Sequence, residues 1–191
     1  MNTRRVLEAG RFAPSGGNNQ PWKFTVITDK TLINEVEESC WAVWDNVQKM
    51  YTNDDTVADL VKSFGEPVQA GIFDPRVMGG VACVANKDLP IFLNAPALIL
   101  MGGNDKMLGP DMQVGIAGQN MNLAALSLGL GFCWIGFSIA INFIPELKAK
   151  LGFDDPWRVL SAAVIGYPKF KQQGIVKRQN RPVTWFRPES K

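Results

Sequence analysis

Residues 13–22 read Ala-Pro-Ser-Gly-Gly-Asn-Asn-Gln-Pro-Trp and separate a short helical pattern from a short apolar run. Pro14 ends the helix predicted for residues 3–12, because proline lacks a backbone donor and restricts the residue before it. The Ser-Gly-Gly that follows predicts a turn whose backbone amides can approach a ligand closely. Two asparagines and a glutamine come next, more polar groups than a plain connector needs. The composition of this segment, called the polar loop below, favours ligand binding over simple connection.

Hydrophobic spacing and turn residues predict alternating helices and strands along the rest of the chain. Helices are expected at residues 3–12, 31–51, 55–64, 110–128 and 145–151, and strands at 23–28, 97–102, 132–137 and 158–165. Asp29 is the expected N-cap of the second helix. The helix over 110–128 has one face of small residues and a second of bulky apolar residues, which places it in a core or an oligomer interface.

Residues 65–90 are rich in glycine and proline but keep enough apolar residues to predict order. We interpret this stretch as an ordered insertion. Two roles remain open for it: a lid over a binding site, or a surface excursion without a function.

Composition excludes several classes of chemistry. The 191 residues fit one domain with a full core, and a net charge of +2 argues against nucleic acid or an anionic membrane as partner. The absence of histidine excludes Ser-His-Asp and Cys-His catalysis and histidine-ligated metals. The three cysteines are too widely spaced for a zinc knuckle or an iron–sulfur cluster, and they indicate reduced thiols of the cytoplasm. With no metal expected, a bound cofactor must supply any redox chemistry.

The polar loop resembles the loop that lies beside FMN in flavoproteins of the nitroreductase family. The matching residues are Ser15, Asn18, Gln20, Pro21 and Trp22. Three further blocks resemble the family in order and spacing: residues 115–130, residues 131–137, and residues 164–168 with a basic pair downstream. The resemblance spans residues 5–186. It implies an α+β fold in a single domain over 1–191, with a mixed, mainly antiparallel sheet flanked by helices and a long central helix at a homodimer interface.

The resemblance also implies a set of FMN contacts. In the polar loop and the helices they are Pro14, Ser15, Gly16, Asn18, Gln20, Asn46 and Gln113. Farther along the chain they are Trp134, Ile135, Gly136, Lys177 and Arg178. The Gly136 amide is expected to donate to flavin N5, and the basic pair to hold the phosphate. Family members usually begin with an Arg-Arg-Ser-x-Arg block that also grips the phosphate, and this sequence lacks that block. Arg178 is therefore expected to carry an unusual share of phosphate binding.

The implied function is that of an FMN-dependent oxidoreductase of the cytoplasm. NADH or NADPH would be the electron donor, a nitroaromatic, a quinone or a similar small molecule the acceptor, and the kinetics ping-pong. No catalytic side chain is expected, because the flavin carries the hydride. Two alternatives stay open: another flavin reaction of the family, such as dehalogenation or dehydrogenation, and a flavin-binding protein without turnover.

Overall fold

The computed structural model describes residues 2–51, 84, 86–170, 180 and 182–187 of the chain. In order, its elements are α1 (Thr3–Arg11), the 3-10 helix η1 (Gly16–Asn18), β1 (Trp22–Ile27), α2 (Lys30–Tyr51), β2 (Ala97–Asn104), α6 (Pro110–Ser127), β3 (Gly131–Ile135), the 3-10 helix η2 (Gly136–Phe143), α7 (Pro145–Lys150) and β4 (Trp157–Gly166). The predicted helix over 55–64 lies outside the described residues. So does most of the 65–90 insertion.

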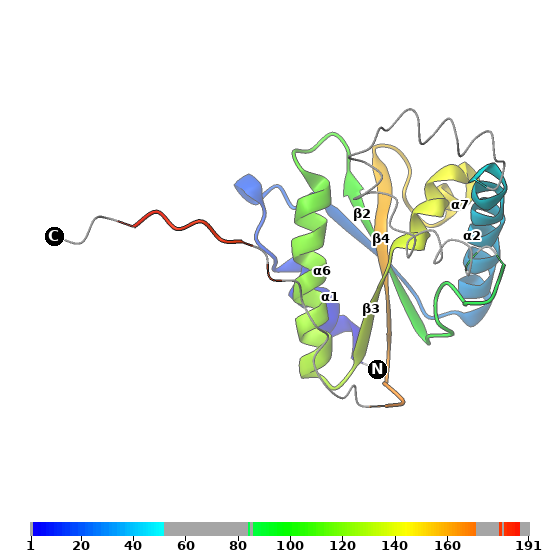
Figure 1. Cartoon of the computed structure of the whole chain (residues 1–191), viewed down its shortest axis with the longest axis horizontal. Helices are drawn as coiled ribbons and strands as arrows, with labels where there is room; N and C mark the ends of the chain where they lie inside the picture. Colours follow the sequence, from blue (N-terminus) through cyan, green and yellow to red (C-terminus); the bar gives the residue numbers. More distant parts are fainter. Residues whose placement is uncertain (1, 52–83, 85, 171–179, 181, 188–191) are drawn as a thin grey trace.

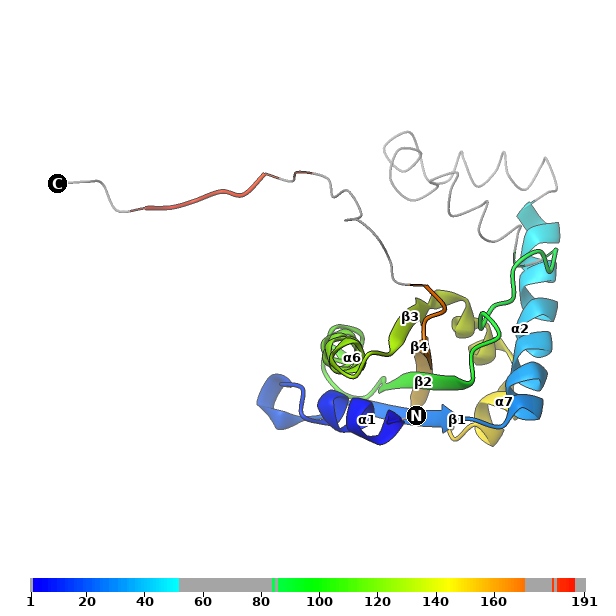
Figure 2. The same cartoon turned by 90° about the horizontal axis from the view of Figure 1, so that it is seen from below.

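The four strands form one sheet in the order β1-β2-β4-β3, and each neighbouring pair is antiparallel. The described part of the sheet is thus antiparallel throughout. It lies between two layers of helices, with α1 and α6 on one side and α2 and α7 on the other (Figures 1 and 2). This arrangement confirms the predicted α+β fold.

Strand β2 is buried along its whole length. It contributes side chains to two hydrophobic cores, one on each face of the sheet. Successive side chains of a strand point to opposite faces of the sheet. Accordingly Ile99 and Met101 pack in the core beneath α1 and α6. Leu98 and Leu100 pack with α2, η2 and α7 on the other face. A continuous apolar run is what a strand with two covered faces requires.

The predicted helix ends agree with the structure where caps define them. The Asp29 carboxylate accepts a bond of 2.8 Å from the Thr31 amide at the start of α2, confirming the predicted N-cap. Helix α6 is followed by Gly129 with a φ of +73°, and the Leu130 amide then donates back to the Ala125 carbonyl. This left-handed glycine ends the helix as its position in the sequence predicts.

The strand predicted for residues 132–137 is wrong at its C-terminal end. Pairing with β4 stops at Ile135, and the chain turns into η2 at Gly136. The apolar run through this segment resembles a strand by composition. Bonds from the side chains of Trp44 and Ser138 to the backbone of this region, and from Asn142 of η2 to the Val159 carbonyl of β4, hold the tight turns instead. No local pattern in the sequence reports such long-range contacts.

Helix α6 presents its two predicted faces differently. On the small-residue side, Gly118 packs against the Trp134 ring and Ala125 is buried. On the bulky side, Leu123 and Leu126 are 57% and 59% exposed. Leu130 of the bulky side is buried, so the part of that side left uncovered within the single chain is the stretch at Leu123 and Leu126. Helix α6 has an apolar character. Even so, no helix in the described ranges, α6 included, is long and apolar enough to span a bilayer.

The two described cysteines differ sharply in environment: Cys40 is buried and Cys133 is exposed. Burial, with a smaller contribution from the Glu37 charge, raises the pKa of Cys40 to about 12. Because the thiolate is the reactive form, brief treatment of the folded protein with iodoacetamide should modify Cys133 and spare Cys40. Peptide mass spectrometry measures both sites. Equal rates at the two cysteines would contradict the burial of Cys40, and prior unfolding in urea is the control that exposes it.

Candidate functional site

The polar loop is a tightly wound segment between α1 and β1. Gly17, Asn18 and Gln20 all have positive φ angles, between +48° and +57°. Two bonds hold this conformation: the Gln20 amide donates to the Ser15 hydroxyl at 3.0 Å, and the Gln20 side chain donates to Asn18 Oδ1 at 2.9 Å. The residues of the predicted motif therefore stabilise one another. The loop stays exposed and preformed, as a binding loop requires.

Gln113 fastens the polar loop to α6. Its Oε1 accepts a bond of 2.9 Å from the Gly16 amide, 97 residues away in the chain. Its Nε2 donates to the carbonyls of Leu108 and Gly109, just before α6 begins. The side chain is 3% exposed, and its whole carboxamide is used inside the protein. Gln113 therefore lies beside the loop that was predicted to bind and supports it from within.

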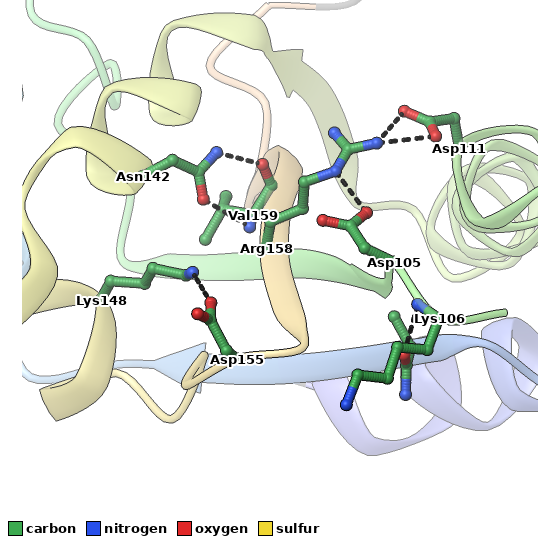
Figure 3. A network of polar contacts seen from close by, with 9 residues as sticks. Asp105, Lys106, Asp111, Asn142, Lys148, Asp155, Arg158 and Val159 are labelled. Atoms are coloured by element: carbon green, nitrogen blue, oxygen red, sulfur yellow. Dashed lines mark hydrogen bonds and ion pairs between the residues drawn. The ribbon is translucent and has the colours of Figure 1, made fainter.

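Arg158 of β4 holds the segment that precedes α6 (Figure 3). Its guanidinium donates two bonds to Asp111 in the first turn of α6, at 2.8 and 2.9 Å, and one of 2.6 Å to Asp105. The two carboxylates raise the pKa of Arg158, the hydrogen bond to Asp105 most of all. Charge-assisted hydrogen bonds of this kind are shorter and stronger than neutral ones. The start of α6, and Gln113 with it, is thereby attached to the sheet.

The end of β3 approaches the same helix. An ideal Cβ on Gly118 would lie 2.1 Å from the Trp134 ring, so that glycine makes room for the indole. Trp134 is still 38% exposed. Gly118 follows Gln113 by five residues, about 7.5 Å along the helix axis. Helix α6 thus contacts the polar loop through Gln113 and the Trp134 ring through Gly118.

Gly136 follows at the point where β3 turns into η2. It is exposed, and an added Cβ would meet no atom within 4 Å. Its amide is the first of a 3-10 helix, and the first amides of a helix have no partner within that helix. The turn therefore places a backbone amide at an exposed residue.

The remaining predicted contacts lie apart from the polar loop or outside the described residues. Ile135 is buried in the core beneath α2. Asn46 is exposed on α2, across the sheet from the polar loop, although α2 contacts η2 through Trp44. Lys177 and Arg178 fall outside the described residues. Within one chain, then, the structure brings Gln113 against the polar loop, and it places Trp134 farther along α6 and Asn46 across the sheet.

Four supporting residues were missed by sequence reasoning: Trp44, Ser138, Asn142 and Arg158. All four act through bonds to the backbone or to acidic side chains far along the chain or across a turn. Only Arg158 carried a signal, as a charged residue at the start of an otherwise apolar strand. For metals, the described part of the chain holds no group of three or more Cys, Asp or Glu side chains suited to an ion.

Comparisons with known proteins agree on one family. The model of the nitroreductase family matches residues 2–167. A Haemophilus influenzae protein named "Putative NAD(P)H nitroreductase" is 28% identical over 185 residues, 92% of this chain and 80% of that protein. An Archaeoglobus fulgidus protein named "Putative NADH dehydrogenase/NAD(P)H nitroreductase" is 26% identical over 170 residues, 86% of this chain and 71% of the other.

Solved structures share the fold at lower identity. A nitroreductase with bound FMN from Bacteroides fragilis superposes with a TM-score of 0.67 at 22% identity, covering 95% of this chain and 86% of that one. A second, from Desulfitobacterium hafniense and also with bound FMN, gives a TM-score of 0.65 at 23% identity, covering 92% and 81%. The family model, the curated relatives and the fold lead to the same conclusion: this chain belongs to the nitroreductase family.

Proposed function

We propose that this protein is an FMN-dependent oxidoreductase that takes electrons from NADH or NADPH and passes them to a nitroaromatic, a quinone or a similar small molecule. Bound FMN would supply the hydride chemistry at its N5 atom. The observation that carries the proposal is the exposed Gly136 at the end of β3, which lies at the same end of the sheet as the preformed polar loop that leads into β1. The matched family model and the FMN named for the two solved relatives support it.

The residues present fit such a cofactor in chemical type. The polar loop offers amide side chains and backbone donors that suit the ribityl chain and the polar edge of the ring. Trp134 offers a partly exposed aromatic plane. Gly136 is exposed and begins η2, where its amide has no partner within the helix and can act on developing negative charge. No side chain need act as acid or base, and the role of the chain is then orientation and electrostatics.

Titration with FMN tests the cofactor assignment. Addition of FMN to the purified protein should quench flavin fluorescence with a saturating curve, and oxidation of NAD(P)H should then require an acceptor. With donor and acceptor binding in turn at one flavin face, double-reciprocal plots at several acceptor concentrations should be parallel. Absence of FMN binding at high micromolar protein would overturn the cofactor assignment. Intersecting lines would overturn the single shared face while leaving the cofactor in place.

Lys177 and Arg178 are proposed as contacts of the FMN phosphate on the strength of the family resemblance. A charge-assisted bond to phosphate contributes about 1.5–3 kcal/mol. Riboflavin, which lacks the phosphate, serves as the matched ligand in the same titration. The proposal requires FMN to bind more tightly than riboflavin, and equal affinities would contradict it.

A homodimer is proposed as the working state, with the protein located in the cytoplasm. The bulky face of α6 supports the dimer: Met112, Leu123 and Leu126 are all exposed and recur at helical spacing along the helix. Replacing Leu123 with glutamate should shift the mass measured by light scattering from dimer to monomer, because a charge buried in an apolar interface is costly. The control, Asn34→Glu, adds the same charge at an exposed position of α2, on the other side of the sheet. A monomeric parent protein would contradict the proposal directly.

A further inference from the structure

The peptide group between Ile135 and Gly136 joins the end of β3 to the start of η2. It is a single planar unit, in which the Ile135 carbonyl and the Gly136 amide point in opposite directions. Whatever holds the carbonyl therefore aims the amide. In the proposed function this amide donates to the flavin. A hydrogen bond to the Ile135 carbonyl would therefore affect the redox reaction through the orientation of the amide.

Ser138 provides that hold. Its side chain is fully buried, and its hydroxyl donates to the Ile135 carbonyl at 2.8 Å. A second hydroxyl, that of Ser161 on β4, lies 3.5 Å from the same oxygen. The shorter bond comes from within the turn itself, three residues along the chain. The carbonyl is therefore drawn toward the protein interior, and the Gly136 amide faces away from it.

The turn around this peptide group is braced from two other elements. The indole of Trp44 on α2 donates to the Phe137 carbonyl at 2.9 Å, and its ring packs edge-on against Phe137 with centroids 5.3 Å apart. Asn142 makes two bonds with the backbone of Val159, at 2.7 and 2.9 Å (Figure 3). These contacts fix where η2 lies. None of them contacts the peptide group between Ile135 and Gly136. The orientation of that group is set by the bond from the Ser138 hydroxyl.

We propose that Ser138 is a positioning residue for the redox reaction, acting through the Ile135–Gly136 peptide. This inference rests on the proposed function. The hydroxyl sets the direction of the Gly136 amide, and by bonding the carbonyl it polarises the peptide, which makes the amide a stronger donor. A donor so placed stabilises negative charge as it develops at the flavin N5 position without having to reorient during the reaction.

The variant Ser138→Ala removes the hydroxyl, and Ser161→Ala is the matched control that removes the weaker neighbour. Loss of a hydrogen bond that acts on the donor should slow reduction of the bound flavin by NAD(P)H about three- to tenfold. The flavin midpoint potential should shift to more negative values, while FMN affinity stays within about twofold of the parent, since a bond to the ring edge is weakened and none is lost. Ser161→Ala should move both quantities much less.

A measurement without FMN separates this inference from the cofactor assignment. In the apoprotein, the NMR resonance of the Gly136 amide should shift in Ser138→Ala and stay near the parental position in Ser161→Ala. If the parent fails to bind FMN, the proposed function is overturned, and the NMR shift still shows whether Ser138 orients the peptide. A folded Ser138→Ala protein with parental potential and parental Gly136 resonance would overturn the role of Ser138. If the alanine variant does not fold, Ser138→Cys, with a weaker donor of similar size, should give smaller shifts in the same direction, and parental values would again overturn the role.

Discussion

Replacing Gly136 with proline is expected to slow reduction of bound flavin by about 100-fold or more, the typical cost of losing one preorganised donor. Proline removes the backbone amide that we propose to act on N5. The backbone can accept the change, because Ile135 is extended (φ −122°, ψ 96°) and proline is well tolerated at the first position of a helix. Stopped-flow reduction by NAD(P)H measures the rate, and fluorescence titration measures FMN affinity. The affinity should change far less than the rate.

Gly136→Ala is the control for this experiment. It restores the amide and adds a methyl group where no atom lies within 4 Å. The alanine variant should therefore keep a rate close to that of the parent. A proline variant that folds, binds FMN and reacts at the parental rate would show that the donor lies elsewhere. A slow alanine variant would point to steric exclusion of the substrate at this position.

Replacing Gln113 with leucine is expected to destabilise the protein by about 2–4 kcal/mol, because it removes the buried carboxamide that bonds the Gly16 amide and the Leu108 carbonyl. The polar loop should also lose its attachment to α6. FMN binding should then weaken by about tenfold, which corresponds to about 1.4 kcal/mol of lost preorganisation. Urea denaturation measures the free energy of unfolding, and titration of the folded protein measures the affinity.

Ser127→Ala gives the matched comparison on the same helix. Its hydroxyl bonds the Ala124 carbonyl at an exposed site, so its loss should change the free energy of unfolding by less than about 0.5 kcal/mol. If Gln113→Leu is as stable as Ser127→Ala and binds FMN with parental affinity, the internal attachment of the loop has no energetic role.

Local chemistry in the sequence was enough to predict most of the elements. Asp29 predicts the start of α2 because a carboxylate bonds the free amides of a first turn, and Gly129 predicts the end of α6 because it tolerates a positive φ. The polar loop was recognised from its turn-forming and amide residues. Its internal bonds, such as the one from the Gln20 amide to Ser15, span only a few residues. They therefore depend on the local sequence alone.

The supporting contacts could not be predicted in the same way. The family resemblance implies that Gln113 contacts FMN, yet nothing in the sequence indicates that its carboxamide meets Gly16 across 97 residues. Arg158 has the character of an ordinary charged residue at a strand end until β4 brings it to Asp105 and Asp111. The apolar residues up to Phe137 predict a strand, whereas the chain turns into η2 at Gly136. Each of these features depends on which elements become neighbours in space, and periodicity carries no such information.

The position of β4 in the sheet has a consequence for how the protein is made. Residues 157–166 are the last strand of the described chain, yet β4 lies in the interior of the sheet and pairs with both β2 and β3. During synthesis on a ribosome, β1 and β2 can pair early, whereas β3 emerges with no strand beside it. The sheet is completed only after residue 166 has left the exit tunnel. Until then, the apolar surfaces of β2 and β3 remain open to chaperones and to other nascent chains.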